Sequence, residues 1–259
     1  LQVRLPAVVV GGGLTAIDTS TEVMAYYPVQ VEKTLQQYEA LAADNGEEAV
    51  RALYFGDEEP GILDEFLEHG RAIRAERARA EAAGEQPDFV PLLRSWGGVT
   101  MAYRKGISNS PAYRLNHEEV AKALEEGIWY AEKLSPTEAL MDEYDALDGL
   151  LFEKQEQIEG RWKGTGETVQ LPARSLFVAA GTSPNVIYER EHPGSFEMDE
   201  RGKFFKRYRV EQNGQGPRLV SDEQREGKPG IFTSHLSESA DGRGRVVSYF
   251  GDNHPDYAG

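Results

Sequence analysis

Cysteine is absent from the 259-residue sequence. Disulfide bonds, cysteine-ligated zinc and a redox-active Cys-x-x-Cys pair are therefore excluded within this chain. The five histidines are scattered without a His-x-x-x-His pair, so no metal site is expected. The Gly-x-Ser-x-Gly pattern of serine hydrolases is missing as well. These absences leave thiol, zinc and serine-hydrolase chemistry without a sequence basis.

Long apolar runs and basic residues are also scarce. No apolar run approaches the ~18 residues that a membrane-spanning helix needs, and no signal-peptide pattern is present. The sequence has 28 Lys and Arg against 44 Asp and Glu, a net charge of −16. A general nucleic-acid binder needs a basic face, so that function is not expected. We expect a cytoplasmic protein without a membrane span. Because the chain starts with Leu shortly before a strand, we also expect it to be a piece of a longer protein.

A glycine-rich turn near the amino terminus is the most informative stretch that is present. Val8–Val10 is all apolar, which is typical of a parallel strand covered on both faces. Gly11, Gly13 and Ala16 follow with the Gly-x-Gly-x-x-Ala spacing of a dinucleotide-binding turn, and a helical pattern begins at Leu14. The free N–H groups and positive dipole end of such a helix attract a pyrophosphate. A generic glycine turn between a strand and a helix is the alternative.

The second strand of this unit comes late in the sequence. The first helix is expected to run to about Tyr26 and to end at Pro28. Residues 31–95 then form a helical insertion with 15 acidic and 7 basic residues. Its predicted helices are Val31–Ala43, Glu47–Phe55, Ile62–Ala83 and Phe89–Ser95. The insertion is interpreted either as a docking surface or as a solvated excursion of the chain.

Two cations stand at the carboxyl end of the delayed strand, Val99–Lys105. An acidic residue at this position would bind the ribose 2′-hydroxyl of NAD, whereas Arg accommodates the 2′-phosphate of NADP. Arg104 offers a planar fork for that phosphate and Lys105 a second charge. A solvated Arg-Lys pair is the alternative interpretation.

The chain continues with an α/β pattern. The segment 116–126 is predicted to be a helix, and Ile128–Ala131 the third strand, closed by Pro136. Residues 138–172 contain short strand candidates at 139–141, 149–153, 160–163 and 168–171, separated by glycine turns, which predicts a β-meander on the parallel sheet. Ser175–Gly181 is another apolar strand candidate.

The predicted fold class is therefore α/β: a Rossmann-like NAD(P)-binding domain with a parallel sheet, helices and a β-meander, carrying a helical insertion. The domain is predicted over residues 1–30 and 96–190, and the insertion over 31–95. Residues 191–259 are predicted to be an irregular segment, with strand segments at 230–234 and 246–252.

Four separated stretches follow one another in an order typical of one family. They are Val8–Asp18, Val99–Lys105 with Ser110-Pro111-Ala112 after it, Phe177–Asn185, and Tyr249–Asp252. On these motifs the chain resembles the NAD(P)H-binding domain of FAD-dependent pyridine nucleotide–disulfide oxidoreductases, most of all the glutamate synthase small-subunit type. The resemblance covers residues 1–30 and 96–190, and part of the last 30.

The resemblance implies a flavoprotein oxidoreductase that passes a hydride from NADPH to FAD, with NADP(H) preferred over NAD(H). Electrons would leave through iron–sulfur clusters or a partner subunit. A second glycine-rich turn for FAD is missing, so residues 191–259 are expected to lead into only part of an FAD-binding half, and the chain alone is not expected to retain FAD or to catalyse. The implied cofactor-binding residues are Gly11, Gly12, Gly13, Leu14, Thr15 and Ala16 at the pyrophosphate, Arg104 and Lys105 at the 2′-phosphate, Ala180 and Gly181 at the return to the FAD domain, and Asp252 at the FAD ribityl group. No side chain is assigned a catalytic role.

A second hypothesis makes the chain an interaction module with vestigial nucleotide binding, whose acidic insertion docks a partner subunit or electron carrier. A third is another Rossmann enzyme such as a methyltransferase. The Arg104-Lys105 pair and the late Gly251-Asp252 strand end argue against the third.

Overall fold

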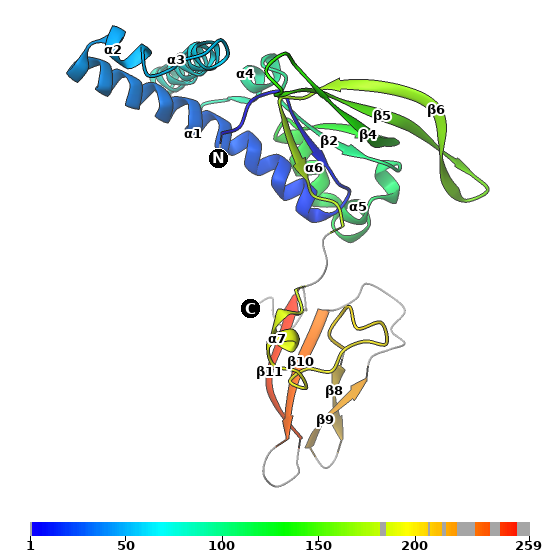
Figure 1. The fold of residues 1–259 in the computed structure, drawn as a ribbon. Coiled ribbons are helices and arrows are strands. Elements are labelled where there is room, and N and C mark those ends of the chain that lie inside the picture. The colour runs from blue at the N-terminus through cyan, green and yellow to red at the C-terminus, as the bar shows by residue number, and fades with distance from the viewer. Residues whose placement is uncertain are drawn as a thin grey trace. The chain divides into compact units, whose positions relative to one another are not determined.

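The computed structural model describes residues 2–181 and 185–206, and the backbone of four strands beyond them. The chain divides into two units, Leu1–Ala180 and Gly181–Gly259, and each is described by itself. The helical segments (Figure 1) are α1 (Leu14–Asn45), α2 (Glu47–Arg51), α3 (Glu59–Ala83), α4 (Val90–Ser95), η1 (Ile107–Asn109), α5 (Pro111–Leu115), α6 (His117–Glu125) and α7 (Ile187–Glu191). The strands are β1 (Ala7–Val10), β2 (Val99–Tyr103), β3 (Trp129–Glu132), β4 (Leu134–Met141), β5 (Leu147–Ile158), β6 (Arg161–Pro172), β7 (Ser175–Val178), β8 (Tyr208–Asn213), β9 (Gly216–Ser221), β10 (Ile231–Glu238) and β11 (Gly244–Asp252).

The first unit is built on a parallel sheet with the strand order β3-β2-β1-β7. Strand β1 lies in its interior, and Val10 is in register with Ala102 of β2 and Val178 of β7. Ala7 and Val9 face one core cluster, together with residues of α1 and α6, whereas Val8 faces a second cluster with Leu150 and Phe152. Burial on both faces explains why this strand is apolar throughout. The expected α/β fold with a parallel sheet and helices is confirmed.

The second face of the sheet is covered by the antiparallel meander β4-β5-β6. The meander was expected, but two of its details were wrong. Pro136 does not close β3; it lies inside β4, which is an edge strand with a bulge between Pro136 and Glu138, where proline is tolerated. The strand candidates at 160–163 and 168–171 are parts of one strand, β6, which pairs with β5 with a register shift between Glu153 and Gln155.

The first helix is much longer than expected, because α1 continues through Pro28 to Asn45. Proline inside a helix costs about 3 kcal/mol, since it lacks an N–H and crowds the preceding turn. Tertiary packing offsets that cost here. Tyr27, Val31 and Leu35 are fully buried on either side of the proline. The separate helix expected from Val31 is therefore the second half of α1.

The helices that follow pack back onto α1. Phe66 and Ile73 of α3 share a core cluster with Tyr27, Val31 and the sheet residues. Arg174, just before β7, forms an ion pair of 2.7 Å with Glu65 of α3 and donates to the carbonyl of Leu5. The insertion thus has its base in the same core as the sheet.

The helix expected over 47–55 is shorter, because α2 ends at Arg51. The side chains of Leu53 and Phe55 remain exposed, so no buried face favours another helical turn there.

The second unit contains α7 and two antiparallel strand pairs, β8-β9 and β10-β11. Strand β10 covers most of the expected segment 230–234, and β11 covers the expected segment 246–252. Met198 and Phe205 add an isolated bridge.

Candidate nucleotide-binding site

The glycine turn connects β1 to α1 at the carboxyl edge of the sheet. Gly11 donates its N–H to the carbonyl of Ala102, 3.1 Å away. A Cβ atom on Gly11 would lie 2.5 Å from the carbonyl oxygen of Ala179 and 2.8 Å from the Cβ of Ala16. Ala16 itself is fully buried. Gly11 and Ala16 therefore let the helix approach the sheet closely, as the spacing predicts.

Gly12 is held from the other side by the end of β2. A Cβ atom on Gly12 would lie 2.2 Å from Cε2 of Tyr103, so the tyrosine ring occupies that space. The carbonyl of Gly12 accepts a hydrogen bond of 3.0 Å from the N–H of Ala112 at the start of α5. The buried hydroxyl of Ser110 caps α5 by accepting from the N–H of Tyr113. These contacts fix the turn between β1, β2 and α5.

Gly13 differs from Gly11 and Gly12 because the position that a side chain would occupy there is open. A Cβ atom there would meet nothing within 4 Å. Gly13 caps the 32-residue helix α1 without a side-chain hydrogen bond, and the first turn of α1 carries no acidic residue. Ala16 is the first residue of α1 whose N–H donates to the carbonyl of Gly13. Leu14 and Thr15 come before it at the amino end of the helix. The positive end of the helix dipole and its free N–H groups therefore face an open surface, an arrangement suited to an anion.

Cations lie close to this surface. Arg104 follows β2 directly and its side chain is exposed. Burial raises the pKa of Tyr103, and the positive charges of Arg104 and Arg114 act against that shift. Among the described residues, no ion pair involves Arg104, Lys105 or Arg114. In the described ranges these three cations are therefore not engaged in ion pairs.

Arg114 was not among the residues singled out from the sequence. It lies on α5, and α5 is anchored to the glycine turn through Ala112 and Gly12. The sequence pattern does not predict that α5 lies at the glycine turn, because the anchor is a backbone hydrogen bond between residues 100 positions apart. The one available signal was a cation shortly after the Ser110-Pro111 start of a helix.

The structure brings some of the expected site residues together and leaves others apart. Gly11 to Ala16 and the pair Arg104-Lys105 lie at the carboxyl ends of the adjacent strands β1 and β2. Ala180 follows Ala179, which donates to the carbonyl of Val10, so it belongs to the same edge.

Two expected residues belong to the second unit. Gly181 has a φ of +74°, a conformation that favours glycine. Asp252 ends β11 opposite Ile231, and its side chain lies outside the described residues.

Groups of three or more His, Asp or Glu side chains that could hold a metal ion are not found in the described ranges. Among the helices of the same ranges, none combines the length and apolar character needed to cross a membrane. The space beside Gly13 is open and lies at the amino end of α1, where backbone N–H groups can bind an anion without a metal-binding side chain.

No protein-family model matches the chain. A curated relative, the uncharacterized protein RP006 of Rickettsia prowazekii, is 27% identical over 201 residues. That similarity covers 73% of this chain and 26% of the relative, so the chain spans about a quarter of the relative's length.

Several solved structures are distantly similar. FprA of Mycobacterium tuberculosis in complex with NADPH is 15% identical, covering 75% of this chain and 41% of FprA, with a TM-score of 0.32. The bacillithiol disulfide reductase of Bacillus cereus is 12% identical, covering 86% of this chain and 37% of the reductase, with a TM-score of 0.28. Thioredoxin reductase of Streptococcus pyogenes is 13% identical, covering 40% of this chain and 30% of the reductase, with a TM-score of 0.28.

Proposed function

We propose that the first unit binds NADPH, with the pyrophosphate at the turn from Gly11 to Ala16. The observation that carries the proposal is the contrast between neighbouring glycines. Gly11 and Gly12 are packed against protein atoms, whereas the position where a Cβ would point from Gly13 is open and lies at the amino end of α1. Backbone N–H groups at a helix amino terminus bind phosphate oxygens without any side chain.

The preference for NADPH over NADH rests on the cations after β2. Arg104 is exposed and, among the described residues, has no ion-pair partner, and Lys105 and Arg114 add further charge. A guanidinium binds a phosphate through two parallel hydrogen bonds, while it offers no comparable pair to a ribose hydroxyl. The 2′-phosphate is the group of NADPH that distinguishes it from NADH, so this edge of the sheet would determine cofactor choice.

The proposed parent protein is an FAD-dependent oxidoreductase of the pyridine nucleotide–disulfide type, resembling the glutamate synthase small subunit and acting in the cytoplasm. Bound FAD would supply the hydride acceptor. The residues of this chain would bind and orient the nicotinamide nucleotide, and none of them would transfer a proton. We expect FAD to be held mainly by other parts of the longer protein, with Asp252 contributing, so the chain by itself would bind NADPH without flavin.

The test is a titration of the purified chain with NADPH and NADH, followed by fluorescence of the nicotinamide. Arg104→Glu should weaken NADPH binding by roughly 10- to 150-fold, the equivalent of one charge-assisted hydrogen bond of about 1.5–3 kcal/mol. NADH binding should be unchanged. Arg71→Glu is the matched control, because Arg71 is an exposed arginine on α3. Equal loss for both nucleotides would contradict the 2′-phosphate assignment, and flavin absorbance in the purified chain would contradict the assignment of FAD to the missing part.

The competing hypothesis of an interaction module with vestigial nucleotide binding makes the opposite prediction, that neither nucleotide binds. Deletion of residues 31–95 is not a usable test, because α1 passes through Pro28 into this region and Phe66 and Ile73 belong to the core cluster of the sheet. Surface substitutions are needed to separate nucleotide binding from partner binding.

A further inference from the structure

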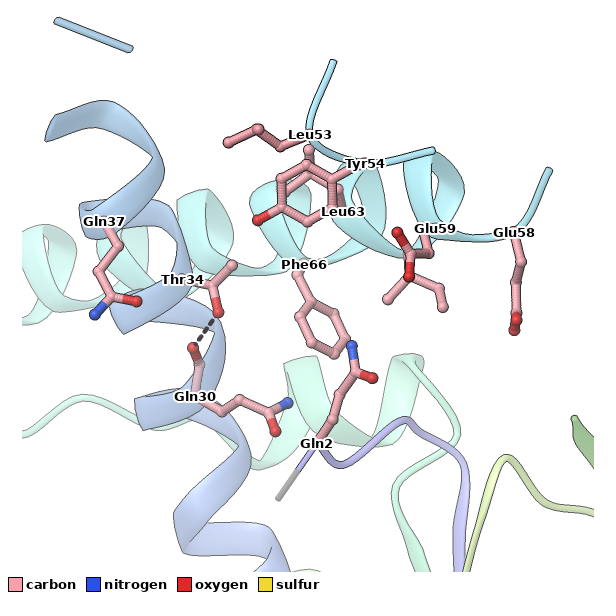
Figure 2. A pocket seen from close by; sticks show the side chains of 11 residues that line it. Gln2, Gln30, Thr34, Gln37, Leu53, Tyr54, Glu58, Glu59, Leu63 and Phe66 are labelled. Carbon is pink, nitrogen blue, oxygen red and sulfur yellow. Dashed lines mark hydrogen bonds between the residues drawn. The ribbon is translucent and has the colours of Figure 1, made fainter. Parts of the chain in front are cut away.

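Exposed apolar side chains gather where α2 leads into α3. Leu53 is 66% exposed, Tyr54 37% and Phe55 76%, three neighbours in sequence. A hollow of about 650 Å³ opens beside them between α1 and α3. Figure 2 shows the side chains around it, with Thr34 on α1 and Phe66 on α3. The lining residues are Gln2, Gln30, Thr34, Gln37, Leu53, Tyr54, Glu58, Glu59, Ile62, Leu63 and Phe66.

By sequence, the same region accounts for half of the net negative charge of the chain. Residues 44–68 contain nine acidic residues and one basic residue, a net charge of −8 out of −16. The rest of 31–95 is balanced, with six residues of each sign. Arg51 pairs with Glu47 and Asp64 inside this stretch, and Arg4 and Arg174 pair with Glu58 and Glu65 from outside it. With Arg4 and Arg174 counted, a net charge of −6 remains. Glu59 lines the hollow, and Asp57 lies two residues before it in the sequence. Both are exposed and, among the described residues, have no ion-pair partner.

Charge complementarity selects the occupant of this surface. A second copy docking through the same surface would bring the same negative charge against it, and an anionic membrane or nucleic acid would also be repelled. A small hydrophilic cation would leave Leu53 and Phe55 uncovered. We propose that the surface docks a basic amphipathic segment of another protein, with its large apolar side chains against Leu53, Tyr54 and Phe55 and its Lys or Arg residues facing Glu58 and Glu59 at the hollow. This inference does not depend on nucleotide binding.

A fluorescent Leu/Lys amphipathic peptide is the probe, and anisotropy with the full 259-residue chain is the measurement. Two matched peptides carry Glu in place of Lys, or Ser in place of Leu. The Leu/Lys peptide should bind in a salt-dependent manner and at least about tenfold more tightly than either matched peptide. Equal binding of all three peptides would overturn the proposal.

Substitutions locate the binding. Leu53→Ser with Phe55→Ser should weaken the Leu/Lys peptide by roughly tenfold or more, and so should Asp57→Lys with Glu59→Lys. The matched controls are Leu124→Ser with Ile158→Ser, at side chains 39% and 38% exposed, and Glu156→Lys on β5. Losses in the controls as large as those in the test variants would overturn the proposal.

Two further measurements keep the outcome unambiguous. Far-UV circular dichroism verifies that each variant is folded, and sedimentation velocity reports the oligomeric state. If the chain is a dimer and the double variant Leu53→Ser with Phe55→Ser is a monomer, the occupant is a second copy. That result would overturn the proposal. NADPH affinity, measured on the same variants, should not change. Failure of the docking proposal is thereby distinguishable from failure of the nucleotide-binding proposal.

Discussion

Alanine substitutions at the three consecutive glycines separate the structural role of the turn from its binding role. Gly11 is packed against the backbone of Ala179, and Gly12 against the ring of Tyr103. Gly13 has φ −96° and ψ 175°, which alanine adopts without strain, and its Cβ would meet no protein atom. The three variants add the same methyl group to adjacent positions, so each is a control for the other two.

The expected magnitudes follow from these surroundings. Gly11→Ala should lower the free energy of unfolding by about 1–3 kcal/mol, because the new methyl group lies 2.5 Å from a carbonyl oxygen that cannot move alone. Gly13→Ala should change it by less than about 1 kcal/mol, because the gain from a stiffer unfolded chain opposes the poorer helix cap. The same methyl group would occupy the space in which a pyrophosphate approaches the N–H groups of α1. Loss of one such charge-assisted bond weakens NADPH by roughly 10- to 150-fold.

Urea unfolding gives the stabilities, and nicotinamide fluorescence gives the dissociation constants. Gly13→Ala should be the variant that loses binding while it keeps its stability, and Gly11→Ala the one that loses stability. Gly12→Ala should show a loss of stability that depends on how far the Tyr103 ring can move. If Gly13→Ala binds NADPH as tightly as the unchanged chain, the pyrophosphate does not lie at this turn and the proposed function is wrong.

The remaining predictions concern a buried polar contact in the helical layer. The Tyr27 hydroxyl lies 2.7 Å from Nδ1 of His69, and the His69 ring stacks on Trp96 at 3.7 Å. Tyr27→Phe would leave that nitrogen without its partner and should cost about 1–3 kcal/mol in urea unfolding. Burial lowers the pKa of His69, so its contribution to stability is present above the unfolded-state value near 6.5 and should be lost as the pH falls below it. A His69→Gln variant should lack this acid-side loss, and an unchanged pH profile in that variant would contradict the assignment.

The strand–turn–helix at the amino terminus was predictable because its signals are local. Val8–Val10 has no polar residue, and Gly11, Gly13 and Ala16 are defined by spacing alone. The neighbours of β1 were harder to foresee, since Val10 is in register with Val178 of β7 as well as with Ala102. Such pairings join segments far apart in the sequence, and the periodicity of apolar residues within each segment does not predict them.

Pro28 shows where local reasoning fails. A proline predicts the end of a helix, yet the residues around it are buried against α3, and that packing outweighs the local cost. The Tyr27–His69–Trp96 cluster has the same cause: its members are 42 and 27 positions apart, so no motif connects them. Tertiary contacts of the long helix decide both features.

The length of α1 also determines how far apart the two proposed binding surfaces lie, and so whether binding at one affects the other. Leu14 begins the helix at the glycine turn, while Gln30 and Gln37, which line the hollow, lie about 24 and 35 Å further along its axis at 1.5 Å per residue. Sites separated by more than about 10 Å without shared partners act additively. Gly13→Ala combined with Leu53→Ser and Phe55→Ser should therefore lose NADPH binding and peptide binding to the same extents as the separate variants. Titration of the combined variant with each ligand, in the presence and absence of the other, measures any coupling. A change of either affinity by more than about threefold would mean that α1 transmits the state of one surface to the other, and the two proposals would then have to be treated as one.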